Sequence, residues 1–256
     1  MNILEQIVAD LRPALEQRKK LLPQAELLRQ IIGMPAAPSF AAALQKERIN
    51  IIAELKKASP SKGLIRSNFN FQECALELEQ AGAAALSVLT ERNYFQGSLE
   101  YLRGASRLVR VPLLCKDFII DPYQICEARL HGAAAILLIA ALLPKAELQF
   151  LAEFAAVVGL EVLGEAHNEE EIQMLLDCGV RIIGVNARDL KTFACDLDNV
   201  KKLLPQIPSD RIAIAESSIN SRQELLDLRK AGAQGFLIGE TLMRAKYPGL
   251  KLKELL

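Results

Sequence analysis

Short apolar runs alternate with amphipathic stretches along most of this chain. The runs are apolar at consecutive positions, as expected for strands that are buried on both faces of a parallel sheet. The stretches between them have apolar residues at helical spacing, as in 71–80, 121–130 and 221–230. We therefore predict alternating strands and helices. The predicted strands are approximately 49–55, 84–89, 112–116, 135–139, 160–165, 181–186, 211–216 and 235–239.

A glycine motif marks the ends of four predicted helices. The segments AGAAALSVL, HGAAAILLI, CGVRIIGVN and AGAQGFLIG each place a glycine shortly before an apolar strand. Glycine suits the left-handed position just past a helix end. These glycines are about 50 residues apart, which leaves room for two strand–helix units in each interval. They are Gly82, Gly132, Gly179 and Gly232.

Eight strand–helix units in about 200 residues favour an α/β fold of one particular type, the (β/α)8 or TIM barrel. The alternative is an open, doubly wound parallel sheet. No linker or low-complexity segment interrupts the chain, so we expect residues 1–256 to form a single domain.

Residues 1–48 precede the first strand and predict an N-terminal helical extension. Apolar residues recur at helical spacing from Leu4 to Leu11. Pro23 can begin a second helix, and Ser39 can cap a third. The pattern leaves two positions open for the extension. It can close the bottom of a barrel, or it can cover the face formed by the carboxyl ends of the strands.

Composition excludes several classes of function. Lys and Arg together number 31, as do Asp and Glu, so a basic surface for nucleic acid is not indicated. The five cysteines form no C-x-x-C pair and are expected to be reduced thiols of a cytoplasmic protein. His131 and His167 lack metal-ligand spacing to any cysteine, so no metal site is expected.

Membrane insertion and secretion are also not indicated. The longest apolar run, 133–143, has 11 residues, whereas a membrane span needs about 20. The first residues, MNILEQIVADLRP, are amphipathic and contain acids, unlike a signal peptide. We expect a soluble, cytoplasmic protein with no membrane contact.

Polar residues follow most of the predicted strands. In a barrel the carboxyl ends of the strands surround one pocket, so these side chains should converge there. Glu54 and Lys56 end the first strand on the same face, and burying such a pair is costly unless it is paired or functional. The other candidates at strand ends are Ser87, Thr90, Glu91, Lys116, Asp117, Leu137, Ile139, Glu165, Asn186, Arg188, Glu216, Ser217, Gly239 and Glu240.

The chemistry of this set is that of general acids and bases. Desolvation lowers the pKa of a lysine and raises that of a glutamate, and opposite charges counter both shifts. Lys116 can form a Schiff base, as in an aldolase, or act as a cationic acid, and the residues alone leave both open. Phe95 and Phe118 can wall an aromatic substrate or pack in the core.

A phosphate site is expected in the last two loops. Barrels often bind phosphate with backbone N–H groups in the loops after strands 7 and 8, which here read AESSIN and LIGETLM. GxGxxG and Walker patterns are absent, so no nucleotide cofactor is expected.

Several of these segments resemble those of indole-3-glycerol phosphate synthase, an enzyme family of tryptophan biosynthesis. The resemblance covers nearly the whole chain. It is carried by IIAELKKASPSKG (51–63), SVLTERNYFQGS (87–98), LLCKDFIIDPYQI (113–125), IIGVNARDL (182–190), AESSI (215–219) and FLIGETLMR (236–244).

The resemblance implies a fold and a reaction. The fold is a (β/α)8 barrel whose N-terminal helical extension, here 1–48, covers the active-site face. The reaction converts 1-(2-carboxyphenylamino)-1-deoxyribulose 5-phosphate into indole-3-glycerol phosphate with loss of carbon dioxide and water. No cofactor or metal is required, and the partner is a small phosphorylated substrate.

The resemblance also assigns roles. Lys116 donates a proton to the substrate ketone, and Glu165 and Lys56 supply the acid–base chemistry of the later dehydration. Glu54 and Asn186 position the substrate and the lysines. The implied substrate-binding residues are Ser59, Phe95, Phe118, Leu137, Arg188, Glu216 and Ser217, and the implied phosphate-binding residues are Ser217, Ser218, Gly239 and Glu240.

The chain departs from the usual family pattern at a few positions. Ser218 replaces a glycine of the phosphate loop, and Gly164-Glu165-Ala166-His167 replaces V-E-V-H. Neither change removes an implied catalytic residue. Two other functions stay open: a Schiff-base aldolase and a catalytically silent barrel that binds a phosphorylated metabolite. The sequence does not fix whether the protein is a monomer or associates non-covalently with another pathway enzyme.

Overall fold

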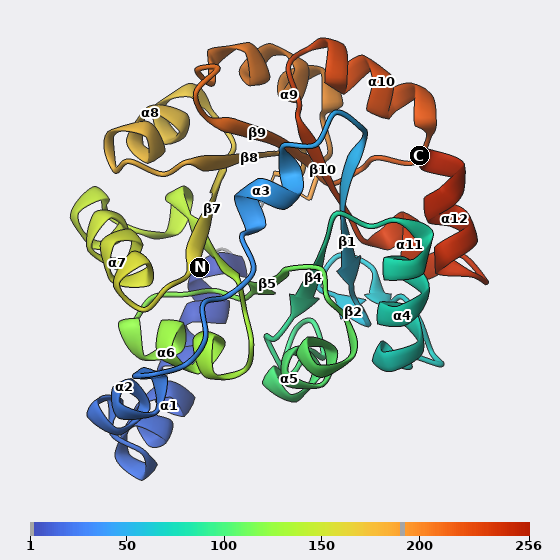
Figure 1. Ribbon diagram of the computed structural model, residues 1–256. Helices are drawn as coiled ribbons and strands as arrows, with labels where there is room; N and C mark the ends of the chain where they lie inside the picture. The colour runs from blue at the N-terminus through green and yellow to red at the C-terminus, as the bar shows by residue number, and fades with distance from the viewer. Residues whose placement is uncertain (1–2, 190–192) are drawn as a thin grey trace.

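Eight parallel strands form a closed barrel at the centre of the structure (Figure 1). This computed structural model describes residues 3–189 and 193–256. Within them β1 pairs with β4 on one side and with β10 on the other, so the sheet has no free edge. The predicted TIM barrel is confirmed, and the open doubly wound sheet is wrong. The barrel strands are β1 (Asn50–Leu55), β4 (Ala85–Leu89), β5 (Leu113–Lys116), β6 (Ala135–Ile139), β7 (Glu161–Ala166), β8 (Ile182–Asn186), β9 (Ile212–Glu216) and β10 (Gly235–Ile238).

Helices surround the barrel, as Figure 1 shows. In the part of the chain that the structure describes, none is long and apolar enough to cross a membrane. The outer helices are α4 (Phe71–Ala81), α5 (Leu99–Leu108), α6 (Pro122–Leu130), α7 (Lys145–Val157), α8 (Glu169–Asp177), α9 (Leu197–Leu203), α10 (Arg222–Lys230), α11 (Glu240–Arg244) and α12 (Pro248–Leu255), with short 3-10 turns η1 (Ala140–Leu142) and η2 (Leu204–Gln206).

Local sequence explains where these helices begin and end. Ser221 accepts a hydrogen bond from the Glu224 N–H, and the Glu224 side chain accepts one from the Ser221 N–H, so α10 begins with a capping box. Asp121 caps α6 in a similar way through the Tyr123 N–H. Helix α4 ends just before Gly82, which has a φ of +104°, a conformation that favours glycine.

The core has two layers separated by the strands. Alternate side chains point to opposite faces of a strand, so neighbours on β1 belong to different layers. Ile52 packs inside the barrel with Leu114, whereas Ile51 packs against the helices with Leu78. All four side chains are fully buried. This double burial explains why the strands have no alternation of apolar and polar residues.

A small hairpin follows β1 and was not predicted. It consists of β2 (Ala58–Ser59) and β3 (Gly63–Leu64), paired antiparallel with Ser59 opposite Gly63. Each strand has only two residues, too few for a periodic pattern to reveal. The hairpin holds the segment that contains Ser61 and Lys62 beside the barrel mouth.

The extension is divided between the two ends of the barrel. The short helix α3 (Phe40–Leu44) lies at the amino ends of the strands, across the middle of the barrel in Figure 1. There the Ala41 N–H donates a hydrogen bond of 2.6 Å to Glu161, the first residue of β7. Asn50, the first residue of β1, donates one of 2.7 Å to the Leu44 carbonyl.

Helix α1 (Ile3–Leu21) instead begins at the opposite end of the barrel. Its residues Leu4 and Ile7 are buried against the interior layer near Phe118. The Tyr94 hydroxyl donates a hydrogen bond of 2.6 Å to Asp10, and Arg18 forms an ion pair of 3.0 Å with Glu127. These contacts fix α1 to the loop after β4 and to helix α6.

Helix α2 (Gln24–Ile31) connects these two parts of the extension along the side of the barrel. It packs on α6, where Leu27 is buried against Tyr123 and Cys126. Figure 1 shows α1 and α2 next to α6 at one edge of the molecule.

Candidate active site

The carboxyl end of β1 places a buried acid beside a lysine. Glu54 is 1% exposed, and Lys56 lies two residues later on the same face. Their side chains form an ion pair, Lys56 Nζ to Glu54 Oε1. Gly239 lies directly beside this pair, where a Cβ would overlap with Glu54 Oε1. The buried carboxylate therefore has a charge partner, and the glycine provides the space for it.

A second pair joins β5 and β7 across the barrel mouth. Lys116 Nζ lies 3.6 Å from Glu165 Oε2, and the Glu165 side chain is 2% exposed. Burial lowers the pKa of the Lys116 ammonium, but the charges of Glu165 and Glu216 outweigh it, so the pKa is raised above its ordinary value. Lys116 therefore stays protonated and can donate a proton.

Glu216 lies at the end of β9 beneath these pairs. Burial and the negative charge of Glu165 raise its pKa to about 8, although Lys116 acts in the opposite direction. Gly184 on the neighbouring strand β8 leaves room for this side chain, since a Cβ there would overlap with Glu216 Oε1. Glu216 is thus a carboxyl group that can hold a proton near neutral pH.

Asn186 and Arg188 follow β8 and extend the polar rim. The Asn186 side chain accepts a hydrogen bond of 2.9 Å from the Arg188 N–H. The Arg188 guanidinium donates one of 3.3 Å to Ser61 and lies 3.6 Å from Glu240. Arg188 thereby joins three loops, those after β1, β8 and β10.

The loop after β9 has an unusual backbone. Ser217 and Ser218 have φ values of +68° and +58°, in the left-handed region that favours glycine. The Asn220 amide donates a hydrogen bond of 2.9 Å to the Ser218 carbonyl. The Thr241 hydroxyl donates one of 2.7 Å to the Ile219 carbonyl and so ties this loop to the start of α11.

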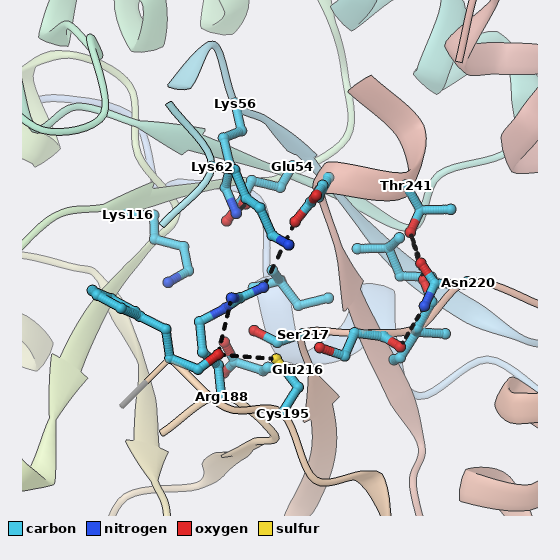
Figure 2. Close-up of a pocket in the computed structure, with 17 residues that line it drawn as sticks. Glu54, Lys56, Lys62, Lys116, Arg188, Cys195, Glu216, Ser217, Asn220 and Thr241 are labelled. Carbon is cyan, nitrogen blue, oxygen red and sulfur yellow. Dashed lines mark hydrogen bonds and ion pairs between the residues drawn. The ribbon is translucent and has the colours of Figure 1, made fainter. Parts of the chain in front are cut away.

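These loops enclose a pocket of about 490 Å³. Figure 2 shows Lys116 and Arg188 on one side of it, and Asn220 and Thr241 on the other. Its four basic side chains outnumber its acidic side chains, so the pocket is suited to a highly charged anion. The basic residues that line it are Lys56, Lys62, Lys116 and Arg188.

A smaller, mostly apolar pocket of about 100 Å³ adjoins the first. The rings of Phe95 and Phe118 lie 6.0 Å apart on its wall, and Leu137 lies beside them. Ile3 and Ile7 of α1 also line it. An aromatic ring fits such a wall, while Lys116 and Glu165 lie at its polar end.

The structure brings all the residues to which the resemblance assigns a role to these two adjoining pockets. Lys56, Lys116 and Arg188 line both. The residues that line one or both are Glu54, Lys56, Ser59, Phe95, Lys116, Phe118, Leu137, Glu165, Asn186, Arg188, Glu216, Ser217, Ser218, Gly239 and Glu240.

Three candidates at the end of β4, Ser87, Thr90 and Glu91, line neither of these pockets. Glu91 accepts hydrogen bonds from the N–H groups of Asn93, Tyr94 and Phe95, so its charge organises the loop after β4. The Thr90 hydroxyl donates a hydrogen bond of 2.6 Å to Asp117. The expectation that these three residues face the pocket is wrong. Ser87 is fully buried, Thr90 bonds to the loop after β5, and Glu91 bonds to its own loop.

Several lining residues were not singled out in the sequence. Lys62, Asn220 and Thr241 belong to the larger pocket, and Ile3 and Ile7 to the smaller one. Lys62 lies within the segment SPSKG, where its basic charge beside a strand end was the available signal. Nothing in the apolar pattern of α1 distinguishes residues facing a pocket from residues facing a core.

Within residues 3–189 and 193–256 no cluster of three or more His, Cys, Asp or Glu side chains is arranged to hold a metal ion. The chemical groups that the site offers are ammonium, guanidinium, carboxylate, amide and hydroxyl. They suit proton transfer and the binding of anions.

Comparisons with known proteins agree with this geometry. The family model described as indole-3-glycerol phosphate synthase matches residues 4–255. The chain is 45% identical over 254 residues to the indole-3-glycerol phosphate synthase of Alkaliphilus metalliredigens, covering 99% of this chain and 97% of that protein. It is 53% identical over 208 residues to that of Koribacter versatilis, covering 81% and 80%.

Solved structures share the fold at low sequence identity. A tryptophan synthase alpha-subunit mutant from Pyrococcus furiosus superposes with a TM-score of 0.61 at 14% identity, covering 80% of this chain and 97% of that chain. KGPDC from Streptococcus mutans superposes with a TM-score of 0.64 at 15% identity, covering 81% and 95%. These likenesses concern the barrel alone. The family match and the curated relatives show that this chain belongs to the indole-3-glycerol phosphate synthase family, and that it is a carboxy-lyase of tryptophan biosynthesis.

Proposed function

We propose that this chain carries out the synthase reaction with Lys116 as the proton donor of ring closure and with Glu165 and Lys56 as the acid–base groups of dehydration. The main support is the ion pair of 3.6 Å between Lys116 and Glu165, at the border between a charged pocket and an aromatic-walled pocket. A substrate with a phosphate at one end and an anthranilate ring at the other would have its reacting atoms at this border.

The two pockets give the substrate one orientation. Its phosphate binds in the larger pocket, near the backbone of Ser217, Ser218 and Gly239, with Glu240 at the rim. Its anthranilate ring lies against Phe95, Phe118 and Leu137 in the smaller one. Arg188 and Ser59 hold the anionic groups, and Arg188 borders both pockets.

Ring closure forms a carbon–carbon bond. The ring carbon that carries the carboxylate attacks the ketone carbon, and the ketone oxygen gains negative charge as its π bond breaks. Lys116 transfers a proton to that oxygen and so yields a hydroxyl group. The raised pKa of Lys116 means that the donor is charged at neutral pH.

The next two steps release carbon dioxide and water. The bond to the carboxylate breaks, carbon dioxide leaves, and its electron pair restores the aromatic ring. An acid then protonates the departing hydroxyl while a base removes a proton from the adjacent methylene carbon. We assign this pair of roles to Glu165 and Lys56, which line the smaller pocket from β7 and from the end of β1.

The remaining buried polar groups orient these catalysts. Glu54 is ion-paired with Lys56 and holds its ammonium at the mouth. Asn186 is fixed beside Arg188 by their hydrogen bond of 2.9 Å and presents its amide to the pocket. Glu216, whose pKa is about 8, holds a proton near neutral pH and becomes negatively charged above it, where its charge helps to keep Lys116 protonated.

The N-terminal segment also has a role in this function, and the enzyme has an expected location in the cell. The start of α1 covers the apolar pocket through Ile3, Leu4 and Ile7 and so excludes water from the reacting centre. The chain acts without a bound cofactor as a single barrel domain of the cytoplasm, where its five free cysteines stay reduced.

The decisive experiment follows the fluorescence of the indole product. Wild-type protein should convert the carboxyphenylamino substrate into indole-3-glycerol phosphate. Lys116→Ala should abolish turnover while the variant still folds and still binds the substrate in a calorimetric titration. Lys253→Ala, on the exposed face of α12, is the control and should match wild type.

Other outcomes would point to other functions. A Schiff-base aldolase needs a neutral amine, which the raised pKa of Lys116 disfavours. Borohydride trapping of a covalent adduct on Lys116 with a phosphorylated ketone would nevertheless establish it. Tight substrate binding by the wild type with no indole product would instead indicate a silent, metabolite-binding barrel.

A further inference from the structure

His167 lies directly behind Glu165 and lines neither pocket. It follows Glu165 by two residues and comes directly after β7, with its ring turned toward the Glu165 carboxylate. His167 Nε2 is 3.6 Å from Glu165 Oε1, and Lys116 Nζ is 3.6 Å from the other oxygen of that carboxylate. Glu165 is thus held between two basic groups, one inside the site and one behind it.

The other side of the imidazole is fixed by Glu171 of α8. His167 Nδ1 lies 3.2 Å from Glu171 Oε2, and the His167 N–H donates a hydrogen bond of 2.8 Å to the same oxygen. The Asn168 amide donates a hydrogen bond of 2.8 Å to the second oxygen of Glu171. This double contact sets the orientation of the ring, because Glu171 is itself held in place.

Both ring nitrogens therefore face carboxylates. A carboxylate accepts hydrogen bonds but cannot donate them, so a ring with hydrogens on both nitrogens fits this setting best. Nε2 is buried and has no hydrogen-bond partner among the described residues. At 3.6 Å its contact with Glu165 is an ion pair without a hydrogen bond, and such contacts can shorten when a substrate binds.

Charge supports the same protonation state. The charged groups that face His167 are Glu165 on its own strand, Glu171 on α8 and Glu216 on β9, with Lys116 beyond Glu165. Burial lowers the pKa of His167, but the hydrogen bond to Glu171 and the charge of Glu165 outweigh it, so the pKa is raised above its ordinary value.

We propose that His167 is a positioning residue for Glu165: as an imidazolium locked by Glu171, it holds one carboxylate oxygen so that the other faces Lys116 and the substrate. This inference rests on the role of Glu165 in the proposed mechanism. The imidazolium also offsets the negative charge of Glu165 at the carboxylate oxygen that does not face Lys116. Loss of its proton at alkaline pH should therefore lower kcat more than it changes KM.

The first test measures the imidazole directly. The chain has two histidines, so His131→Gln leaves a single imidazole whose NMR signals report His167. His131 lies at the end of α6, where its ring contacts the Glu127 carbonyl. His167 should titrate above its ordinary pKa, and adding Glu165→Gln should lower that pKa. The NMR signal is needed because the pKa of Glu216 is also raised, to about 8, so Glu216 would contribute to a kinetic pH profile as well.

The second test distinguishes the contribution of Nε2, which faces Glu165, from that of Nδ1, which faces Glu171. In His167→Gln the amide can occupy the place of Nε2 toward Glu165, and in His167→Asn it can occupy the place of Nδ1 toward Glu171. If the ring acts through Glu165, kcat should fall about tenfold or more in His167→Asn and clearly less in His167→Gln. KM should stay within about twofold in both, since neither touches the substrate.

The outcomes distinguish this inference from the proposed function. An inactive wild type would contradict the proposed function and leave the NMR titration as the test of His167. The inference is overturned if an active wild type is matched by both variants, or if Glu165→Gln leaves the His167 titration unchanged. It is also overturned if His167→Gln is the more impaired variant, since the ring would then act through Glu171 as a structural contact.

Discussion

Gly239 at the end of β10 leaves the space that the Glu54 carboxylate of β1 occupies. A Cβ at residue 239 would overlap with Glu54 Oε1 and lie 3.0 Å from the Glu54 Cβ. The two strands are neighbours in the barrel, and Glu54 is ion-paired with Lys56. The absence of a side chain at Gly239 therefore determines where Glu54 and Lys56 can lie at the barrel mouth.

Gly239→Ala should therefore impair catalysis through Glu54. We expect kcat to fall at least about tenfold, because the displaced carboxylate no longer holds Lys56 in place. Kinetics with the indole fluorescence assay measure this effect. Gly179→Ala is a suitable control, since Gly179 has a φ of +72° and open space around it far from the site. It should lower Tm and leave kcat unchanged, whereas equal kcat values for the two variants would contradict the role of Gly239.

Glu165→Gln should lower kcat by about two to three orders of magnitude with little change in KM. The amide keeps the shape of the carboxylate but can no longer take up and release a proton. The same change should lower the pKa of Lys116, because Glu165 is the largest of the charges that raise it. Glu147→Gln, on the exposed face of α7, controls for the loss of a charge. A Glu165→Gln enzyme with near-normal kcat would exclude Glu165 from the chemistry.

The barrel was predictable because all its strands meet the same physical requirement. Each strand is buried on both faces, so runs such as 135–139 are apolar throughout and stand out from the helices. Glycines with positive φ, among them Gly82, mark the return from helix to strand. Since parallel strands end at one face, the polar residues that follow them could be grouped without any coordinates.

The sequence shows which residue types follow the strands, but it could not predict which way each side chain points. Glu165 lies near the end of β7 and Glu91 just after β4, but only Glu165 lines the site pockets, since Glu91 is used by three N–H groups of its own loop. The extension likewise supplies residues to both ends of the barrel, α3 to one and α1 to the other. Apolar periodicity identifies a helix and its buried face, but not the surface that this face covers.

Ser218→Gly should stabilise the protein. Ser218 has a φ of +58°, which costs a residue with a side chain about 1 kcal/mol relative to glycine. We expect the Tm to rise by about 2–4 °C in a thermal scan. The substitution also removes a hydroxyl from the phosphate end, so KM should rise about threefold or more. A higher Tm with unchanged KM would show that the hydroxyl does not contact the phosphate.

Glu216 should make stability depend on pH. Its pKa is raised to about 8 in the folded protein, so the folded state binds more protons than the unfolded state between the ordinary value of 4.5 and about 8. The contribution of Glu216 to the free energy of unfolding is then complete below pH 4.5 and is lost as the pH rises through about 8.

Glu216→Gln removes this titration and tests it. The variant should not lose this stability as the pH rises. The difference in the free energy of unfolding, variant minus wild type, should therefore be about 1–3 kcal/mol larger at pH 9 than at pH 5. Thermal or urea unfolding across this range gives the comparison. Glu147→Gln, whose carboxylate is exposed, should follow the wild-type curve throughout. If the Glu216→Gln and wild-type curves are parallel, Glu216 is ionised in the folded protein, and the carboxyl group beneath Lys116 carries a full negative charge at neutral pH.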